Sequence, residues 1–369
     1  MTANIKPKRI VLTGGPCAGK TTVLEHITAH CSQNGIKAFC VPEVASILIG
    51  GGADLGALDL DGLLSFERNL IQTQLLLEET YLDLAARWNG PAVVICDRGT
   101  MDVSAYLPEH VWRVLLNGYG WTEVALRDQR YDAVIHLVSA AVGAPEFYTT
   151  ENNAARNETA EQAASLDAAV QNAWIGHPHL RVINATQDFD KKVAQTLAVV
   201  DGLIGKDSNL EIERKYLLDD GFDASSLPVH HKTFLIEQTY LKNSDGGVER
   251  VRSRRADGAA SYTHTVKRKL KDGVREEIER AISGDEYIAL LERADPSREQ
   301  IQKNRHCFLW GDLYFELDSF LGSHQGLNLL EVELMDLSDS PTLPEFIPVS
   351  RDVTSEGDFT NAALARKDR

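Results

Sequence analysis

Short apolar runs alternate with longer amphipathic segments along the first half of the chain. The apolar runs have the length of buried strands and lie at 9–13, 37–42, 91–97, 131–138 and 180–183. The segments between them carry apolar residues at helical spacing, most clearly at 21–31, 63–87 and 189–203. Strands that alternate with helices predict an α/β domain, in which a parallel sheet carries helices on both faces.

The pattern changes after a short polar linker at 205–209. Strand-length runs then follow one another with turn residues between them, which is typical of antiparallel strands. Eight strands and one helix are predicted, the strands at 210–218, 234–241, 248–255, 261–270, 274–282, 302–310, 312–320 and 328–335, and the helix at 285–293. We therefore predict two domains, 1–206 and 208–369, the second an antiparallel eight-stranded β-barrel with flanking helices.

Charged residues recur at every second position in seven of these strands. Because side chains alternate between the faces of a strand, residues i and i+2 share a face. The sets are Glu211, Glu213 and Lys215; Arg250, Arg252 and Arg254; Lys267 and Lys269; Arg275, Glu277 and Glu279; Lys303 and Arg305; Glu316 and Asp318; and Glu331 and Glu333. One set alone is most simply a solvated strand face, but seven indicate a closed barrel with a charged interior. Such charges must be matched, and a polyphosphate with Mg²⁺ or Mn²⁺ would match them.

A glycine-rich loop lies between the first predicted strand and the first predicted helix. It has the pattern G-x-x-x-x-G-K-T of the P-loop and comprises Gly14, Gly15, Pro16, Cys17, Ala18, Gly19, Lys20 and Thr21. Its backbone amides and the helix N-terminus bind phosphate, so ATP or GTP is the expected ligand, and Thr22 is included in the site. Lys20 is expected to reach the β- and γ-phosphates, and the Thr21 hydroxyl to ligate Mg²⁺.

Charged residues also follow the second and third predicted strands. Glu43 either faces the substrate at the edge of the sheet, or is a helix cap or a surface carboxylate. Asp97 and Arg98 match the Walker-B pattern, in which the carboxylate orients Mg²⁺ or a nucleophile and the arginine contacts substrate or phosphate. The alternative for Asp97 is a helix cap. Arg156, in a polar segment, is either a lid cation over the phosphates or part of a solvated helix.

Two family resemblances rest on these residues. The first 205 residues resemble the nucleoside- or nicotinamide-riboside-kinase-like P-loop proteins, often classed as AAA-type ATPases, through the P-loop, Pro42-Glu43, Asp97-Arg98-Gly99 and Asn-Asn-x-x-Arg at 152–156. The stretch from about 208 to 366 resembles the CYTH family, or triphosphate tunnel metalloenzymes, which includes class IV adenylyl cyclases, thiamine triphosphatases and inorganic triphosphatases. The motifs are Glu-x-Glu-x-Lys at 211–215, Arg-x-Arg at 250–252, Thr-Val-Lys at 265–267, Arg-x-Glu-x-Glu at 275–279, Arg305, Glu316-x-Asp318 and Glu331-x-Glu333.

The CYTH resemblance implies a role for each member of the charged face. The first metal would be bound by Glu213, Glu331 and Glu333, and a second metal or the attacking water by Glu211 and Asp318. The triphosphate would be held by Lys215, Arg250, Arg252, Lys267 and Arg305, to which we add Lys269 and Arg275 from the same face. The expected catalytic residues are Glu211 and Lys215, with Asp97 in the first domain.

The same resemblance leaves the activity open. Hydrolysis is the commoner activity among members with the Glu-Ile-Glu-Arg-Lys start, so a triphosphatase is preferred and a cyclase is the alternative. The whole architecture also resembles a P-loop–CYTH fusion of animals that is linked to membrane trafficking. That resemblance implies a rival function, the nucleotide-regulated binding of a phosphorylated ligand or phospholipid headgroup without turnover.

Composition and the absence of certain motifs argue against several other classes of protein. The net charge of −16 argues against sequence-independent nucleic-acid binding. The five cysteines are odd in number and form no Cys-x-x-Cys pair, which favours a reduced, cytoplasmic protein. The sequence shows neither a signal-peptide core nor an apolar run of membrane-spanning length. No Asn-Lys-x-Asp motif is present, so ATP is preferred and GTP stays open, while the oligomeric state is not predicted.

Overall fold

The computed structural model describes residues 7–143, 159–184, 188–204, 212–243, 247–271, 274–334 and 340–367, with the backbone alone at 143, 212, 267–271 and 274–277. The chain divides into two compact units, Met1–Ser208 and Asn209–Arg369. In the described part of the chain, no helix has both the length and the apolar character needed to cross a membrane.

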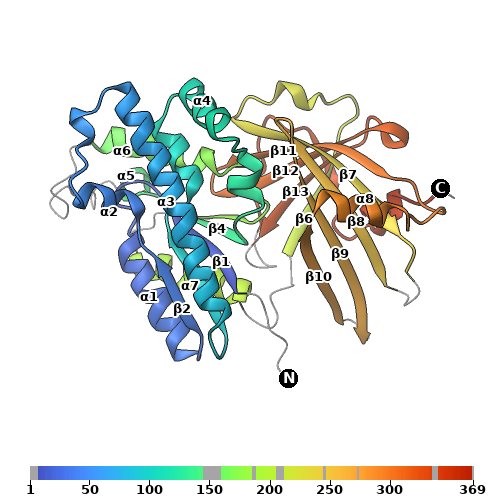
Figure 1. The fold of residues 1–369 in the computed structure, drawn as a ribbon. Coiled ribbons are helices and arrows are strands. Elements are labelled where there is room, and N and C mark those ends of the chain that lie inside the picture. Colours follow the sequence, from blue (N-terminus) through green and yellow to red (C-terminus); the bar gives the residue numbers. More distant parts are fainter. Residues whose placement is uncertain are drawn as a thin grey trace. The chain divides into compact units, whose positions relative to one another are not determined.

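The first unit is built on a parallel sheet of five strands. Their order is β2 (Lys37–Val41), β3 (Ala92–Asp97), β1 (Lys8–Thr13), β4 (Ala133–Leu137) and β5 (Leu180–Ile183). Helices flank both faces (Figure 1), so the predicted α/β domain is confirmed. The helices are α1 (Lys20–Gln33), α2 (Val44–Gly50), α3 (Leu60–Ala86), α4 (Glu109–Tyr119), α5 (Ala140–Gly143), α6 (Ala160–Ala173) and α7 (Phe189–Ile204), with the short turns η1 (Leu55–Ala57), η2 (Thr100–Tyr106) and η3 (Val124–Asp128).

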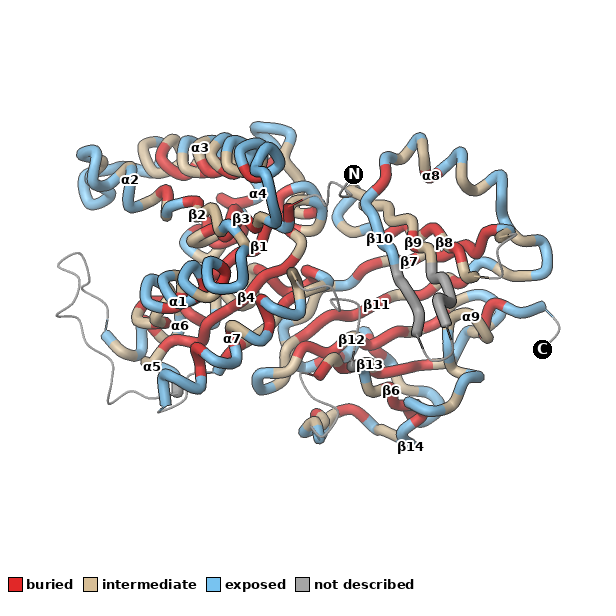
Figure 2. Tube along the Cα trace, turned by 90° about the horizontal axis from the view of Figure 1, so that it is seen from below, coloured by how far each residue is buried: buried red, intermediate tan, exposed pale blue. Residues whose placement is uncertain are grey.

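Both faces of this sheet are buried, as the red strands in Figure 2 show. On one face, Ile10 and Leu12 of β1 belong to a core cluster that includes Ile27 of α1 and Val200 of α7. On the other face, Val11 is equally buried, and α3 packs against β2 and β3. A strand that is buried on both faces forms a continuous apolar run, which is why these strands could be located from the sequence.

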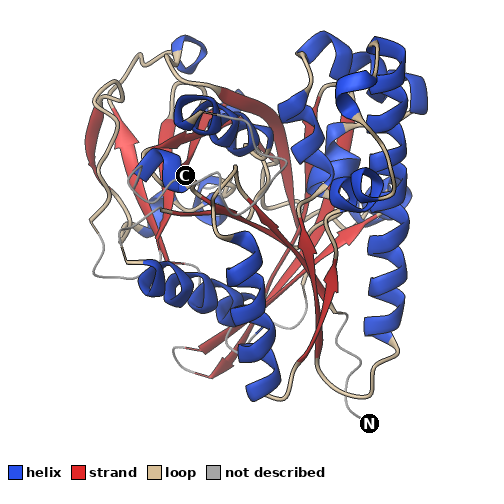
Figure 3. Cartoon of the chain, turned by 90° about the vertical axis from the view of Figure 1, so that its left-hand side faces the viewer, coloured by secondary structure: helices blue, strands red, loops and turns tan. Residues whose placement is uncertain are grey.

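The second unit is an antiparallel sheet whose long, twisted strands are drawn red in Figure 3. The nine strands follow the order β10 (Val274–Ile282), β9 (Ala259–Lys271), β8 (Val248–Ala256), β7 (His231–Leu241), β11 (Ile301–Trp310), β12 (Leu313–Phe320), β13 (Asn328–Leu334), β6 (Ile212–Leu218) and β14 (Val349–Asp352). The helical elements of this unit are α8 (Gly284–Leu291), α9 (Asn361–Leu364), η5 (Ala224–Ser226), η6 (Gly322–His324) and η7 (Gly357–Phe359).

The prediction of eight strands in this unit is wrong, because β14 adds a ninth. This strand pairs with β6 at one edge of the sheet. It is four residues long and none of its residues is buried, so it lacks the apolar alternation by which the other strands were recognised. The sheet order ends at β10 and β14, and the described ladders include no pairing between these two strands.

The sheet of the second unit has one apolar and one charged face. Phe308, Phe315 and Leu317 belong to a buried cluster on the apolar face. Phe346, from the segment that follows β13, packs edge-to-face on Trp310, with ring centroids 5.1 Å apart, and against this cluster. The apolar face is therefore covered by the protein's own chain.

Candidate functional site

The cross-strand register brings predicted charges together on the other face of the nine-stranded sheet. Lys215 on β6 lies opposite Glu331 on β13, and Glu331 lies opposite Glu316 on β12. Asp318, two residues farther along β12, lies opposite Arg305 on β11. Directly opposed residues of paired strands project to the same face. Charges from four adjacent strands therefore meet here.

Arg305 is the centre of this charged face. Its Nε donates to Asp318 Oδ1 at 2.7 Å, and its Nη2 donates to Asp318 Oδ2 at 2.6 Å and to Glu331 Oε2 at 2.8 Å. Its Nη1 donates to Glu316. Burial alone would lower the pKa of Arg305, but Asp318 and Glu316 outweigh burial and raise this pKa well above its usual value. The guanidinium is therefore a permanent cation that three carboxylates hold in one orientation.

Two lysines complete this network. Lys303 is buried and pairs with Asp318, while Lys215 Nζ lies 2.7 Å from Glu331 Oε1. Burial opposes the ionisation of Glu331, yet the surrounding arginine and lysines outweigh burial and lower the pKa of Glu331. Asp318 already accepts hydrogen bonds from Lys303 and Arg305. A metal ion would have to weaken one of these pairs to bind Asp318.

A second group of cations lies on β8. Arg250 Nη1 and Arg252 Nη2 both donate to Gln238 Oε1 at 3.3 Å, so two arginines share one neutral acceptor. Arg250 also lies 3.9 Å from Glu279 Oε2. The Nε of Arg252 is buried and has no hydrogen-bond partner among the described residues. Burial, and then the charge of Arg250, lowers the pKa of Arg252, and a bound polyanion would relieve both effects.

The carboxylates of β6 and β13 offer oxygen ligands beside these cations. Glu213 and Glu333 lie directly opposite each other, and Glu331 is two residues from Glu333 on the same face. The described ranges contain no cluster of three or more His, Cys, Asp or Glu that could hold a metal ion by themselves. Mg²⁺ usually takes one or two carboxylates and completes its shell with substrate phosphates and water. The pair of Glu213 and Glu333 fits such a site in ligand type and number.

The P-loop of the first unit lies between β1 and α1. Gly14 has a φ of +143°, and a Cβ at this residue would come within 2.2 Å of the carbonyl oxygen that ends β4. Lys20 Nζ donates to the carbonyls of Gly14 and Gly15 at 2.8 and 3.1 Å. Burial, and then the charge of Arg98, lowers the pKa of Lys20 to about 7. A phosphate would replace these carbonyls with a charged partner and favour the ammonium form.

Asp97 ends β3 at the edge of the sheet where parallel strands present their ligands. Its Oδ1 is buried and has no hydrogen-bond partner among the described residues, and burial raises its pKa. Thr21 and Thr22 are exposed in the first turn of α1. One carboxylate and one hydroxyl next to a phosphate-binding loop are the protein ligands that a nucleotide-bound Mg²⁺ takes.

Arg98, which follows Asp97 in the chain, pairs with two acidic side chains. It has a left-handed backbone with a φ of 68°. Its Nε donates to Glu43 Oε1 at 2.5 Å, and its Nη1 lies 3.4 Å from Asp102 Oδ2 and from Gly14 O. Glu43 precedes α2 but makes no capping bond with its side chain. Glu43 is therefore an ion-pair partner of Arg98 at the P-loop.

Two buried carboxylates near the P-loop were not predicted. Asp102 in η2 accepts from Thr13 Oγ1 at 2.7 Å and from Trp174 Nε1 at 2.6 Å. Asp167 in α6 accepts from the backbone amide of Gly15 at 2.7 Å. Neither aspartate ends a strand or belongs to a recognised motif. Only the tertiary structure brings them to the loop.

Comparison with known protein families agrees with the division of the chain into two units. The model of one family, an AAA domain, matches residues 9–192, and the model of another, a CYTH domain, matches residues 209–346. The chain is a fusion of an AAA domain of the P-loop type with a CYTH domain. Both predicted resemblances are thereby confirmed. None of the curated proteins compared with the chain matches it.

Several solved structures are similar to the CYTH part of the chain. The inorganic triphosphatase NE1496 is 26% identical over 42% of this chain and 94% of its own, with a TM-score of 0.31. HpAC1 from Hippeastrum, described as having a dominant triphosphatase activity, is 21% identical over 34% of this chain and 80% of its own, with a TM-score of 0.26. PH1819 from Pyrococcus horikoshii OT3 is 21% identical over 34% and 78%, with a TM-score of 0.27.

Some predicted site residues lie outside the described part of the two domains. In the CYTH domain these are Glu211 and the side chains of Lys267, Lys269 and Arg275; in the AAA domain it is Arg156. The roles of these residues therefore stay predictions.

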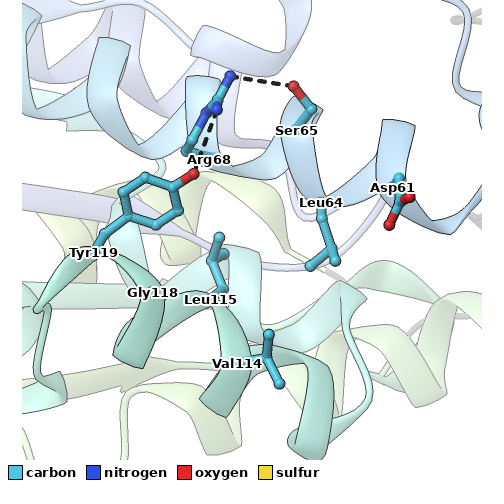
Figure 4. Close-up of a pocket in the computed structure, with 8 residues that line it drawn as sticks. All are labelled: Asp61, Leu64, Ser65, Arg68, Val114, Leu115, Gly118 and Tyr119. Carbon is cyan, nitrogen blue, oxygen red and sulfur yellow. Dashed lines mark hydrogen bonds between the residues drawn. The ribbon is translucent and has the colours of Figure 1, made fainter.

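The AAA domain also contains a cavity between α3 and α4 (Figure 4). Its volume is about 320 Å³, and Leu64 and Leu115 form part of its wall. Arg68 is half-buried here and donates from Nη1 to Tyr119 OH at 3.3 Å. No P-loop residue lines this cavity.

Proposed function

We propose that the CYTH domain hydrolyses inorganic tripolyphosphate or an organic triphosphate with the help of Mg²⁺ or Mn²⁺. The observation that supports this proposal is the charged face, on which buried cations from β6, β8 and β11 are held beside carboxylates of β12 and β13. A soluble fold rarely buries so many charges without a ligand to match them. A triphosphate with its metal ion matches both signs of charge.

The residues of the charged face divide into two roles in this proposal. Lys215, Arg250, Arg252 and Arg305 bind the phosphate oxygens, together with Lys267, Lys269 and Arg275. Glu213, Glu331 and Glu333 would hold the metal, and Glu211 would orient the attacking water. The metal would polarise the terminal phosphoryl group and acidify that water.

The proposed chemical step on the charged face is the attack of water on the terminal phosphorus. The anhydride P–O bond breaks, and the products are orthophosphate and the shortened phosphate chain. The leaving oxygen gains negative charge, which Arg250 and Arg252 would stabilise as hydrogen-bond donors. Asp318 and Glu316 act by holding Arg305 in position.

We further propose that the AAA domain binds ATP, or GTP, and transfers its γ-phosphoryl group to a small molecule. Lys20 would bind the β- and γ-phosphates, and Thr21 and Asp97 would hold Mg²⁺. The acceptor hydroxyl attacks the γ-phosphorus, the bond to the β-phosphate oxygen breaks, and the hydroxyl proton is lost as the nucleoside diphosphate leaves. Arg98, which Glu43 holds by a hydrogen bond, would contact the transferred group.

Phosphate release by the full chain tests the triphosphatase proposal. Tripolyphosphate, ATP, GTP and thiamine triphosphate are each supplied with Mg²⁺ or Mn²⁺, and the wild type is compared with Glu333→Ala. We expect release from at least one substrate and its loss in the variant. Tight binding without release would instead support a binding protein for a phosphorylated ligand or phospholipid headgroup. Formation of cyclic AMP from ATP would support a cyclase.

A further inference from the structure

Glu67 is a buried carboxylate that the mechanisms above do not use. Its side chain lies in the first half of α3, and the residue is 6% exposed. It makes no hydrogen bond or ion pair within the described ranges of the chain. The carboxylate oxygens of Glu67 are not among the buried side-chain atoms that lack a hydrogen-bond partner, so solvent reaches them. A largely buried carboxylate that is open to solvent and has no described protein partner is free to accept hydrogen bonds from a ligand.

The contacts of α3 show where Glu67 lies relative to the sheet. Glu67, Gln74 and Glu78 share one face of the helix. Glu78 Oε2 lies 3.7 Å from Nη1 of Arg9, the second residue of β1. Gln74 Nε2 donates to Arg98 O, just after β3 ends, at 3.3 Å. This face of α3 therefore runs from the amino edge of the sheet to its carboxyl edge.

Continuing along α3 places Glu67 beyond that carboxyl edge. Seven residues of helix separate Gln74 from Glu67, which corresponds to about 10 Å. α3 also packs against α2, which follows directly after Glu43. The carboxyl edge is where the P-loop, Asp97 and Arg98 lie. Glu67 is therefore about 10 Å farther out on the same side.

We propose that Glu67 binds the phosphoryl acceptor of the AAA domain at the end remote from the transferred phosphate. The inference rests on the proposed kinase function of this domain. Glu43 and Asp102 already accept hydrogen bonds at the P-loop, whereas Glu67 does not. A carboxylate accepts hydrogen bonds but donates none when ionised. The acceptor therefore carries a hydroxyl at one end and an amino, amide or cationic group at the other.

The protonation of Glu67 agrees with this role. Burial raises the pKa of Glu67 to about 7, so an amino or cationic group bound nearby would favour the ionised form. A group without a donor would instead leave the buried carboxylate unmatched. Discrimination between two such acceptors by one buried polar contact is commonly large.

Nucleosides that differ at one position provide the probes. Cytidine and uridine share the ribose hydroxyls and differ at the pyrimidine ring, where cytidine has an amino group and uridine a carbonyl. Nicotinamide riboside adds a cationic ring with an amide. The full chain is given MgATP and each nucleoside in turn, and the phosphorylated nucleoside is measured by mass spectrometry. The proteins compared are wild type, Glu67→Gln, Lys20→Ala and Asp83→Asn, the last being an exposed carboxylate on the same helix.

We expect the wild type to phosphorylate cytidine or nicotinamide riboside at least about 10-fold more efficiently than uridine. Glu67→Gln should raise the KM for the preferred nucleoside about 10-fold, with a smaller effect on kcat, and Asp83→Asn should change neither. An unchanged KM in Glu67→Gln would overturn the role of Glu67 alone. No transfer to any of these nucleosides by the wild type would overturn this inference, whereas a wild type that does not bind ATP or GTP would overturn the kinase proposal.

Folding provides the second readout. If Glu67 had a structural role, its substitution would lower the Tm of the protein. If Glu67 binds the acceptor, its substitution should not lower the Tm, because it has no described partner to lose. A Glu67→Gln protein with an unchanged or higher Tm and a raised KM supports the proposal. A Tm several degrees lower than that of the wild type would contradict it.

Discussion

Arg305 and Asp318 face each other across β11 and β12, and two hydrogen bonds of 2.7 and 2.6 Å join the guanidinium to the carboxylate. Asp318 is fully buried. The pair fixes the plane of an arginine that also contacts Glu316 and Glu331. The orientation of this proposed phosphate-binding group is therefore set by the protein before any ligand arrives.

Replacing Asp318 by Asn tests this positioning. The variant keeps the shape of the side chain but leaves Arg305 and Lys303 without their shared buried counter-charge. We expect the free energy of unfolding of the CYTH domain to fall by about 3–5 kcal/mol, as is typical when one partner of a buried pair is removed. Urea unfolding measures this change. Asp352→Asn, an exposed carboxylate on β14, is the control, and an equally small effect of both substitutions would show that Arg305 is held by other contacts.

We expect Glu67 to make the free energy of unfolding of the AAA domain depend on pH. The pKa of Glu67 is raised from 4.5 to about 7 in the folded protein, so the folded state binds this proton more tightly than the unfolded state. The stabilisation from proton binding is present at pH below 4.5 and is lost as the pH rises toward 7. Glutamine does not ionise, so the free energy of unfolding of Glu67→Gln should exceed that of the wild type at pH 8, by up to about 3 kcal/mol.

Differential scanning calorimetry at pH 5 and pH 8 measures this effect. The gain in Tm of Glu67→Gln should be larger at pH 8, and Asp83→Asn should show no such difference. A variant that loses stability equally at both pH values would mean that the carboxylate has a protein partner.

The two domains should be separable by mutation. Lys20→Ala removes the ammonium that is expected to contact the β- and γ-phosphates, so we expect nucleotide binding to the AAA domain to weaken at least about 100-fold. Hydrolysis of tripolyphosphate should remain within about twofold of the wild-type rate, because the proposed residues for it are in the CYTH domain. Equilibrium dialysis with ADP and phosphate release measure the two effects. Lys37→Ala, which changes a lysine on β2 near Trp88, is the control. A parallel loss of both activities in Lys20→Ala would contradict the assignment of hydrolysis to the CYTH domain.

Alternation along the strands was sufficient to find the charged face. Lys215, Glu331 and Arg305 were grouped from their spacing in the sequence, and the register places them on one face because the side-chain period of a strand is two. Gln238 was missed because it is neutral, although it binds both Arg250 and Arg252. The short strand β14 was missed because it has no buried residue to create a pattern.

The acidic residues around the P-loop were harder to predict. Asp97 and Glu43 could be proposed because each follows a strand that ends at the same edge of the sheet. Asp102, Asp167 and Glu67 lie within helical elements, where a carboxylate is most often solvated. Their burial follows from the packing of η2, α6 and α3, which spacing along the chain does not determine.

The rate of tripolyphosphate hydrolysis by Arg252→Ala tests the central claim most directly. Arg252 is on the charged face, and the described part of the chain gives it one hydrogen-bond partner, Gln238, so its loss should disturb the fold little. Arg255, three residues away on the same strand, is exposed and pairs with Glu237, which makes Arg255→Ala the matched control. With Mg²⁺ or Mn²⁺, we expect kcat/KM to fall about 100-fold in Arg252→Ala and to remain unchanged in Arg255→Ala. Equal rates in all three proteins would contradict a triphosphate site on this face.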